Sequence, residues 1–159
     1  MYKVELKEYL KNKEFEITSF EQKEGKEGNP RMYDLTSLQV DANKKYGFSA
    51  DETLKLIQGL YEKKLTTYPR VDTTYLTEDL HPKIPNILKG MQYYSRFTES
   101  VLAKPIPKSS TVFNDKKVTD HHAIIPTTSL PQNLSEPEQK IYFMVVQRFI
   151  AIFFPKSGI

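Results

Sequence analysis

The 159-residue sequence contains no cysteine. This absence excludes disulfide bonds, thiolate-based zinc or iron–sulfur sites and cysteine-nucleophile chemistry, and it fits a reducing compartment. An excess of charge of one sign is also missing, because 23 Lys and Arg stand against 20 Asp and Glu, for a net charge of +3. That mild bias is compatible with nucleic-acid binding and common in proteins that bind none. The length predicts one domain, or one domain with a small annex.

Long hydrophobic runs are absent as well. The most apolar stretch, 141–154, contains Gln147 and Arg148 and is shorter than the roughly 20 residues that a membrane span needs. We therefore interpret it as a buried helix. The first residues alternate apolar and charged side chains and lack the apolar core of a secretory signal, which predicts a cytoplasmic protein with no membrane partner. The glycine-rich loop of P-loop ATPases is also missing.

The N-terminal part has the pattern of a small β annex. Apolar and charged residues alternate over 1–20, which predicts two short strands. The segment 21–30 is rich in Glu, Lys and Gly and predicts a surface loop. We place the boundary of this annex near residue 34.

Helical patterns follow. A helix over 35–46 is predicted to begin after Asp34 as N-cap and to end at Gly47, where a left-handed residue would stop it. A second helix over 50–63 begins with the capping box formed by Ser49 and Glu52.

A third helix is outlined by Ile84, Ile87, Leu88 and Met91 and is expected to end before two prolines, Pro105 and Pro107. The pair 112–113 is a candidate short strand, and 123–126 a buried extended segment. A last helix, opened by Ser135 and Glu138, is expected to contribute most of the core. The predicted fold class is mainly α with a small β annex.

Tyr68, Pro69 and Arg70 form the first candidate site. Proline stiffens the backbone of the tyrosine, and a guanidinium two residues on projects to the same side of an extended chain. A phosphate could bridge the two side chains. A phenol attacks phosphorus near neutral pH only when cations stabilise its anion and the charge that develops on the phosphoryl oxygens. Asp72 is either a partner of Arg70 or a turn-capping carboxylate. By itself, the same tripeptide is far more often an ordinary turn with a partly buried tyrosine ring.

His121 and His122 form the second candidate site, directly before the buried segment 123–126. Two imidazoles that titrate near neutrality could donate to a phosphate or relay a proton. Zinc is the competing interpretation. It is disfavoured because adjacent histidines in an extended chain point to opposite faces and His81 is the only other histidine. The other alternative is that both histidines are structural or surface residues without a chemical role.

Together these residues resemble the type IA DNA topoisomerases, and their details resemble the topoisomerase III branch. Four ordered blocks carry the resemblance: Leu38 to Ala50 (LQVDANKKYGFSA), Thr53 to Glu62 (TLKLIQGLYE), Thr67 to Asp72 (TYPRVD) and Asp120 to Thr127 (DHHAIIPT). The branch-specific features are proline after the tyrosine and the pair of histidines. The resemblance covers roughly 33–154 and implies the tyrosine-bearing helical gate domain over 35–159, with 1–34 belonging to the neighbouring arch domain.

The resemblance implies a role for each site residue. Tyr68 is implied to be the nucleophile that cleaves one DNA strand and holds its 5′ end as a phosphotyrosine, and Arg70 to position the phosphate. His121 aligns with the active-site histidine, and His122 is its branch-specific neighbour; either could contact the scissile phosphate. Further predicted DNA-binding residues are His122, Thr127, Gln58 and Asp72. The implied protein changes DNA topology without ATP and is bacterial and DNA-associated.

The sequence also departs from the family pattern. Val71 stands where a threonine is usual, which removes a hydroxyl, and Thr73 stands where a serine is usual, which keeps one. In addition, nothing matches the Toprim domain, whose Glu and Asp-x-Asp carboxylates hold Mg²⁺ in the family. We therefore expect no metal site in this chain, and we expect it to be inactive without the Toprim and arch domains.

Two other functions compete with this one. A non-catalytic module that docks nucleic acid or a protein partner would use the same surfaces and perform no chemistry. A tyrosine recombinase would need an Arg and a His-x-x-Arg motif upstream of its tyrosine, whereas the histidine pair here lies downstream.

Overall fold

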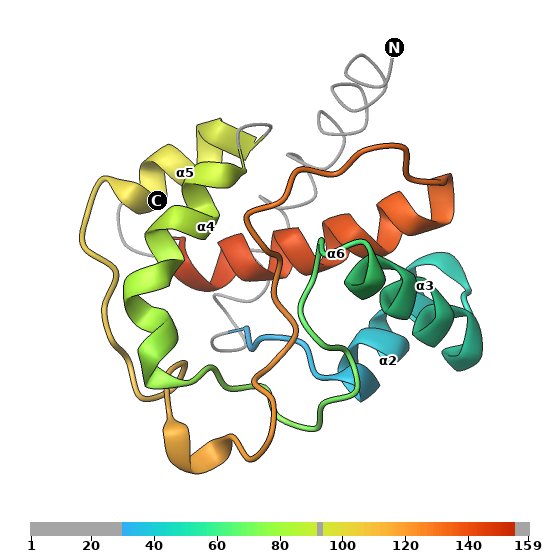
Figure 1. Cartoon of the computed structure of the whole chain (residues 1–159), viewed down its shortest axis with the longest axis horizontal. Helices are drawn as coiled ribbons and strands as arrows, with labels where there is room; N and C mark the ends of the chain where they lie inside the picture. The colour runs from blue at the N-terminus through green and yellow to red at the C-terminus, as the bar shows by residue number, and fades with distance from the viewer. Residues whose placement is uncertain (1–29, 92–93, 155–159) are drawn as a thin grey trace.

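The computed structural model describes residues 30–91 and 94–154 (Figure 1). This part of the chain is mostly helical, and its extended segments pair only through isolated bridges rather than a sheet. The mainly helical class predicted from the sequence is therefore confirmed. The two strands predicted within 1–20 lie outside the described residues, as does nearly all of the predicted loop 21–30.

The first two helices have the predicted ends. Helix α2 spans Leu35–Tyr46, with the Asp34 carboxylate accepting from the Ser37 N–H and Gly47 in the left-handed region at φ 74°. Helix α3 spans Ala50–Glu62, and the side chains of Ser49 and Glu52 each accept from the other's backbone N–H. Capping groups hydrogen-bond to the amides that the helix leaves without partners. Because these groups lie next to the helix in the sequence, the helix ends could be predicted.

Helix α6, Glu136–Phe153, forms the centre of the core. It runs across the middle of the molecule, with α2 and α3 at one end and α4 and α5 at the other (Figure 1). It packs against α3 and α5. Its Tyr142, Phe143 and Phe149 side chains are almost completely buried, as the apolar run predicted.

The predicted third helix is interrupted. After the 3₁₀ helix η1, Glu78–Lys83, the chain forms α4, Ile84–Gly90, and then α5, Ser95–Leu102. At Gly90 the backbone of α4 approaches the Thr128 backbone so closely that a Cβ would lie 3.3 Å from the Thr128 carbonyl oxygen. Helix α4 ends there with Met91 at ψ 61°. The contact comes from a distant segment, so local apolar spacing could not reveal it.

The segment 123–126 is buried and extended, as predicted, and lies between two other pieces of the chain. Ile124 bridges to Tyr33 and Pro126 bridges to Thr66, both antiparallel. The predicted strand at 112–113 is wrong: Phe113 forms only an isolated parallel bridge with Leu76, and a 3₁₀ helix, η3 (Asp115–Lys117), follows shortly afterwards.

Within the described ranges, no helix is long and apolar enough to cross a membrane.

Candidate active site around Tyr68

A tight turn at the end of α3 directs the chain into the Tyr68 segment. The Lys64 N–H donates to the Tyr61 carbonyl at 2.9 Å, and the Leu65 N–H donates to the Leu60 carbonyl at 3.0 Å. This is the Schellman pattern, in which the residue after the cap is left-handed. That residue is Lys64, at φ 65°. Leu60 and Leu65 are both buried, as is usual for the apolar residues at these two positions of the motif.

The extended segment after this turn pairs with the histidine segment. The Thr67 N–H donates to the Ile125 carbonyl at 3.0 Å, and the Thr127 N–H donates to the Leu65 carbonyl at 3.0 Å. The pairing brings Tyr68 and His121 together, with ring centroids 4.4 Å apart and ring planes at 36°. Tyr68 is half-buried and His121 is exposed, so the pair is accessible at the surface. Two of the predicted catalytic residues therefore meet.

Tyr61, near the end of α3, adds a second aromatic ring beside Tyr68. Its ring meets Tyr68 edge to face, with centroids 5.4 Å apart and planes at 82°. It is 38% exposed, so it does not act as a core residue. Its position as the second-last residue of α3, with the chain reversing directly after the helix, is the only signal that could have placed it beside Tyr68.

His122 faces inward while His121 does not. Its Nδ1 lies 2.7 Å from its neighbour's carbonyl oxygen, that of Ala123, and donates to it in the neutral tautomer. Burial lowers the pKa of His122, although this hydrogen bond and the Asp79 carboxylate oppose the shift. The ring is therefore mostly neutral near pH 7, with Nε2 left as an acceptor.

Arg70 lies along α3. It is exposed and lines a groove of about 300 Å³ with Gln58 and Glu62. The remaining lining residues are Asp51, Leu54, Lys55 and Gly59. The Gln58 amide donates to Glu62 at 3.5 Å, a long hydrogen bond. Two predicted site residues thus share one groove beside the α3 face that ends at Tyr61.

Asp72 is exposed, and within the described residues neither it nor Arg70 has a hydrogen bond or ion pair. The structure therefore gives no support to Asp72 as a partner that holds Arg70.

The threonine positions around the site have distinct partners. The Thr127 hydroxyl donates to the Lys64 carbonyl at 2.6 Å and thereby holds the turn after α3. The Thr73 hydroxyl donates to the Lys117 carbonyl at 2.7 Å. Val71 packs in the core at 9% exposure, so the missing hydroxyl at this position is replaced by apolar contact.

No group of three or more His, Asp or Glu side chains that could hold a metal ion occurs in the part of the chain that the structure describes. The remaining histidine, His81, is occupied elsewhere: its Nε2 lies 2.6 Å from the Ile106 carbonyl oxygen, and its ring meets Phe113 edge to face.

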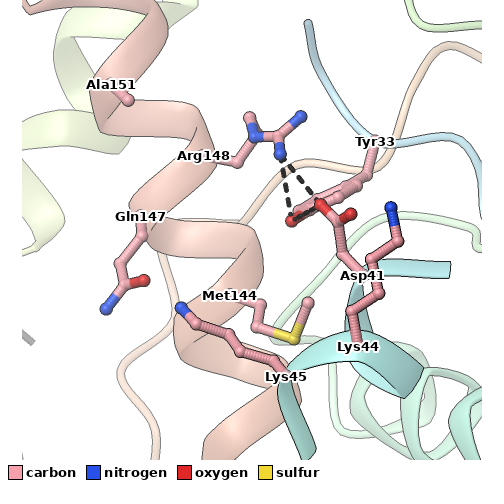
Figure 2. Close-up of a pocket in the computed structure, with 8 residues that line it drawn as sticks. All are labelled: Tyr33, Asp41, Lys44, Lys45, Met144, Gln147, Arg148 and Ala151. Carbon is pink, nitrogen blue, oxygen red and sulfur yellow. Dashed lines mark hydrogen bonds and ion pairs between the residues drawn. The ribbon is translucent and has the colours of Figure 1, made fainter. Parts of the chain in front are cut away.

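A separate cavity of about 230 Å³ lies between α2 and α6 and contains none of the predicted site residues. Lys44 and Lys45 of α2 and Gln147 and Met144 of α6 line it, and the Lys45 side chain extends towards α6 (Figure 2). Its floor includes Arg148, which was predicted only as part of a buried helix.

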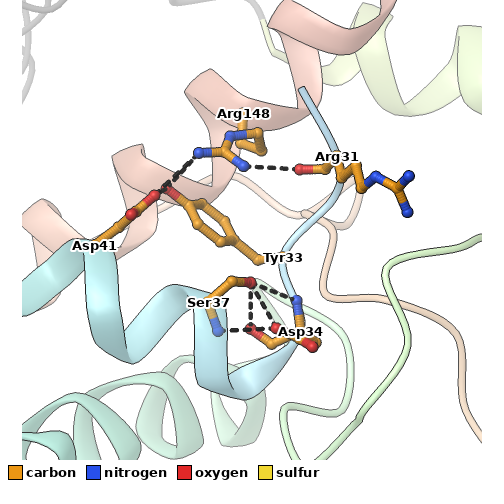
Figure 3. Close-up of polar contacts among 6 residues, drawn as sticks. All are labelled: Arg31, Tyr33, Asp34, Ser37, Asp41 and Arg148. Carbon is orange, nitrogen blue, oxygen red and sulfur yellow. Dashed lines mark hydrogen bonds and ion pairs between the residues drawn. The ribbon is translucent and has the colours of Figure 1, made fainter. Parts of the chain in front are cut away.

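Arg148 ties three parts of the chain together. It donates to the Arg31 carbonyl at 2.8 Å, to the Tyr33 hydroxyl at 3.3 Å and to the Asp41 carboxylate at 3.0 Å (Figure 3). The guanidinium also lies over the Tyr33 ring, 4.2 Å from its centroid. Since Tyr33 bridges to Ile124, this network also helps to hold the segment that follows the two histidines.

Comparison with known proteins identifies the family. A family model described as DNA topoisomerase matches residues 3–158. The chain belongs to this family.

Relatives named DNA topoisomerase 3 include one from Bacillus cereus strain ATCC 14579, 45% identical over 144 residues that cover 87% of this chain and 20% of the relative. The one from Bacillus subtilis strain 168 is 40% identical over 151 residues, covering 92% of this chain and 21% of the relative. The resemblance to the topoisomerase III branch is confirmed, and the chain spans about a fifth of the length of these relatives.

Proposed function

We propose that Tyr68 is the nucleophile of a type IA topoisomerase reaction that cleaves and rejoins one DNA strand. The phenolic oxygen attacks a backbone phosphorus, the bond to the 3′ oxygen breaks, and that oxygen leaves as a hydroxyl with the proton lost by the phenol. The new phosphotyrosine ester retains the free energy of the phosphodiester. Reversal of the same step therefore rejoins the strand without ATP. The observation that carries the proposal is the surface-accessible contact between Tyr68 and His121.

His121 and Arg70 are proposed to act on the same phosphate. The imidazole beside the phenol would donate a hydrogen bond to a phosphoryl oxygen, and the guanidinium would neutralise charge that develops there. Arg70 is exposed and has no partner among the described residues that would have to be displaced. Of the two histidines, His121 is the better candidate for the phosphate contact, because His122 faces inward and is held by Ala123.

Single-stranded DNA is the proposed substrate. The strand would pass Tyr68 and continue along the groove beside α3, where Gln58 and Arg70 lie. His122, Thr127 and Asp72 are proposed as further contacts at the same edge of the molecule. The hydroxyl of Thr127 already donates to Lys64, so its DNA contact would use the remaining acceptor capacity or the methyl group.

The chain is proposed to act as the tyrosine-bearing gate domain, 35–159, with 1–34 belonging to the arch domain. In the full-length enzyme, a Toprim domain would hold Mg²⁺ and an arch domain would guide the movement of the gate. No part of this sequence matches a Toprim domain, and the described residues contain no carboxylate cluster for the ion. We therefore expect the chain alone to be inactive. Its cytoplasmic location remains a prediction.

The test is a chimera in which this chain replaces the matching segment of the Bacillus subtilis relative. The chimera is incubated with Mg²⁺ and a 3′-labelled single-stranded oligonucleotide, whose label stays on the strand that becomes attached to the protein, and is then denatured. We expect a covalent protein–DNA adduct that Tyr68→Phe abolishes. Tyr61→Phe is the matched control, because it removes a hydroxyl from the adjacent ring and should leave the adduct in place.

Two outcomes would reject the proposal. An adduct that persists in Tyr68→Phe would assign the chemistry to another residue. A folded chimera that binds the oligonucleotide but never forms an adduct would favour the non-catalytic docking module.

A further inference from the structure

We propose that Thr67 is a positioning residue whose hydroxyl holds Tyr68 against His121. The inference rests on the proposed function, since the alignment of the two rings matters for chemistry only if Tyr68 attacks DNA. A threonine at position 67 does not by itself indicate a function. Its importance comes from where the structure places its side chain.

The Thr67 side chain faces the segment that carries the histidines. Its Oγ1 accepts from the Ile125 N–H at 3.0 Å and donates to the Ala123 carbonyl at 3.4 Å. The Thr67 backbone N–H donates to the Ile125 carbonyl at 3.0 Å. One residue therefore makes three hydrogen bonds across the pairing, directly before the tyrosine.

The pairing uses this hydroxyl because one residue of the opposite segment has no backbone donor. Pro126, which bridges to Thr66, has no backbone N–H. The Ile125 N–H is taken by the Thr67 side chain rather than by a backbone carbonyl. Removing the hydroxyl would leave this buried amide without a partner, and the two segments would separate to let water reach it.

The same hydroxyl also acts on the second histidine. The Ala123 carbonyl accepts both from Thr67 and from Nδ1 of His122. Thr67 is thus connected to the group that anchors His122 and, through the strand pairing, to the position of His121. No other described side chain hydrogen-bonds to this part of the histidine segment from the tyrosine side.

Thr66 provides a matched control. It is the adjacent threonine in the same extended segment, it is 1% exposed, and its hydroxyl has no hydrogen-bond partner. Thr66→Val and Thr67→Val make the same chemical change at neighbouring positions. Only the second removes hydrogen bonds.

The experiment measures the ring contact by nuclear magnetic resonance on the whole chain, without DNA. In wild type and Thr66→Val, we expect nuclear Overhauser effects between the Tyr68 and His121 rings. In Thr67→Val these should disappear, and exchange of the Ile125 amide should accelerate about tenfold or more. Thr67→Ser, which keeps the hydroxyl, should restore both signals, whereas Thr67→Ala should not.

The Ser and Ala variants share the loss of the methyl group and differ only in the hydroxyl, so they decide the question if Thr67→Val does not fold. An intact ring contact in folded Thr67→Val or Thr67→Ala would overturn the proposal. So would an equal loss in Thr66→Val, or global unfolding of every variant that lacks the hydroxyl while Thr66→Val folds.

A second arm uses the chimera with the Bacillus subtilis relative. Adduct formation should fall about tenfold to a hundredfold in Thr67→Val and remain unchanged in Thr66→Val. If Tyr68 is not the nucleophile, Tyr68→Phe leaves the adduct unchanged, whereas the resonance arm still tests Thr67. Loss of the ring contact with full retention of Tyr68-dependent adduct would reject the positioning role.

Discussion

The Tyr68 phenol and the His121 imidazole lie with their ring centroids 4.4 Å apart, although they come from distant parts of the sequence. Neither residue belongs to a helix. Their contact is produced by the pairing of 65–67 with 123–127. The helices of this protein therefore serve mainly to hold two short extended segments side by side.

Arg70→Ala is predicted to reduce DNA cleavage without destabilising the fold. The side chain is exposed and without a described partner, so the free energy of unfolding should change by about 0.5 kcal/mol or less. Adduct formation by the chimera should fall at least about tenfold, because the phosphate loses a charged donor. Thermal melting and the adduct assay measure the two effects, and Lys89→Ala, an exposed cation on α4, is the control. A large fall in melting temperature would make Arg70 structural.

His122 is predicted to make the stability depend on pH. Burial lowers its pKa in the folded chain below the 6.5 of an exposed histidine. Its contribution is therefore fully present above about pH 6.5 and is lost as the pH falls towards the folded-state pKa. Urea unfolding at pH 7.5 and pH 5.5 should show this loss in the wild type and a smaller one in His122→Gln. Equal losses in both proteins would contradict the assignment.

Arg148→Met is predicted to destabilise the fold. The substitution breaks the contacts to Arg31, Tyr33 and Asp41 around a side chain that is only 14% exposed. Because Asp41 is 37% exposed and can be resolvated, we expect a loss of about 2 kcal/mol rather than the 3–5 of a fully buried pair. Chemical denaturation checks the value. Lys55→Met removes an exposed pair with Asp51 and should cost less than about 0.5 kcal/mol.

Lys63 is predicted to stabilise the fold at neutral pH and to lose this effect in acid. Its ammonium lies 2.8 Å from the Glu138 carboxylate and joins the end of α3 to the first turn of α6. Burial alone would raise the pKa of Glu138, but Lys63 and the Ser135 donors outweigh it and the net pKa is lowered from 4.5. The contribution is therefore present above about pH 4.5 and is lost as the pH falls below it.

Lys63→Met should reduce the free energy of unfolding at pH 7 by about 1 kcal/mol. At pH 3 the difference in this free energy between wild type and variant should be smaller. Denaturation curves at the two values provide the measurement. A difference that stays constant between them would show that the ion pair contributes nothing.

Helix ends were predictable because local groups determine them. Asp34, Gly47, Ser49 and Ser135 cap their helices through contacts within a few residues, and all four were read correctly. The break between α4 and α5 was missed because it coincides with the approach of Thr128 to Gly90. A contact between segments distant in sequence leaves no local pattern.

The candidate site was predictable only in part. The resemblance supplied Tyr68, Arg70 and the two histidines, and the structure brings Tyr68 and His121 into contact. Tyr61 and Thr67 were missed because their significance depends on which segments pair. Arg148 was missed for a different reason: its polar partners lie on α2 and on the segment before it, so a single charge within an apolar run gave no sign of them.

The turn at Lys64 leaves only three residues before Tyr68. In an extended chain, successive side chains alternate between opposite faces. The Tyr68 phenol therefore faces His121 only because an odd number of residues separates it from the turn. A single residue inserted or deleted between the turn and the tyrosine would invert the alternation and aim the ring at the other face, even with every helix unchanged. Evolution of this loop is thus restricted in length as well as in composition.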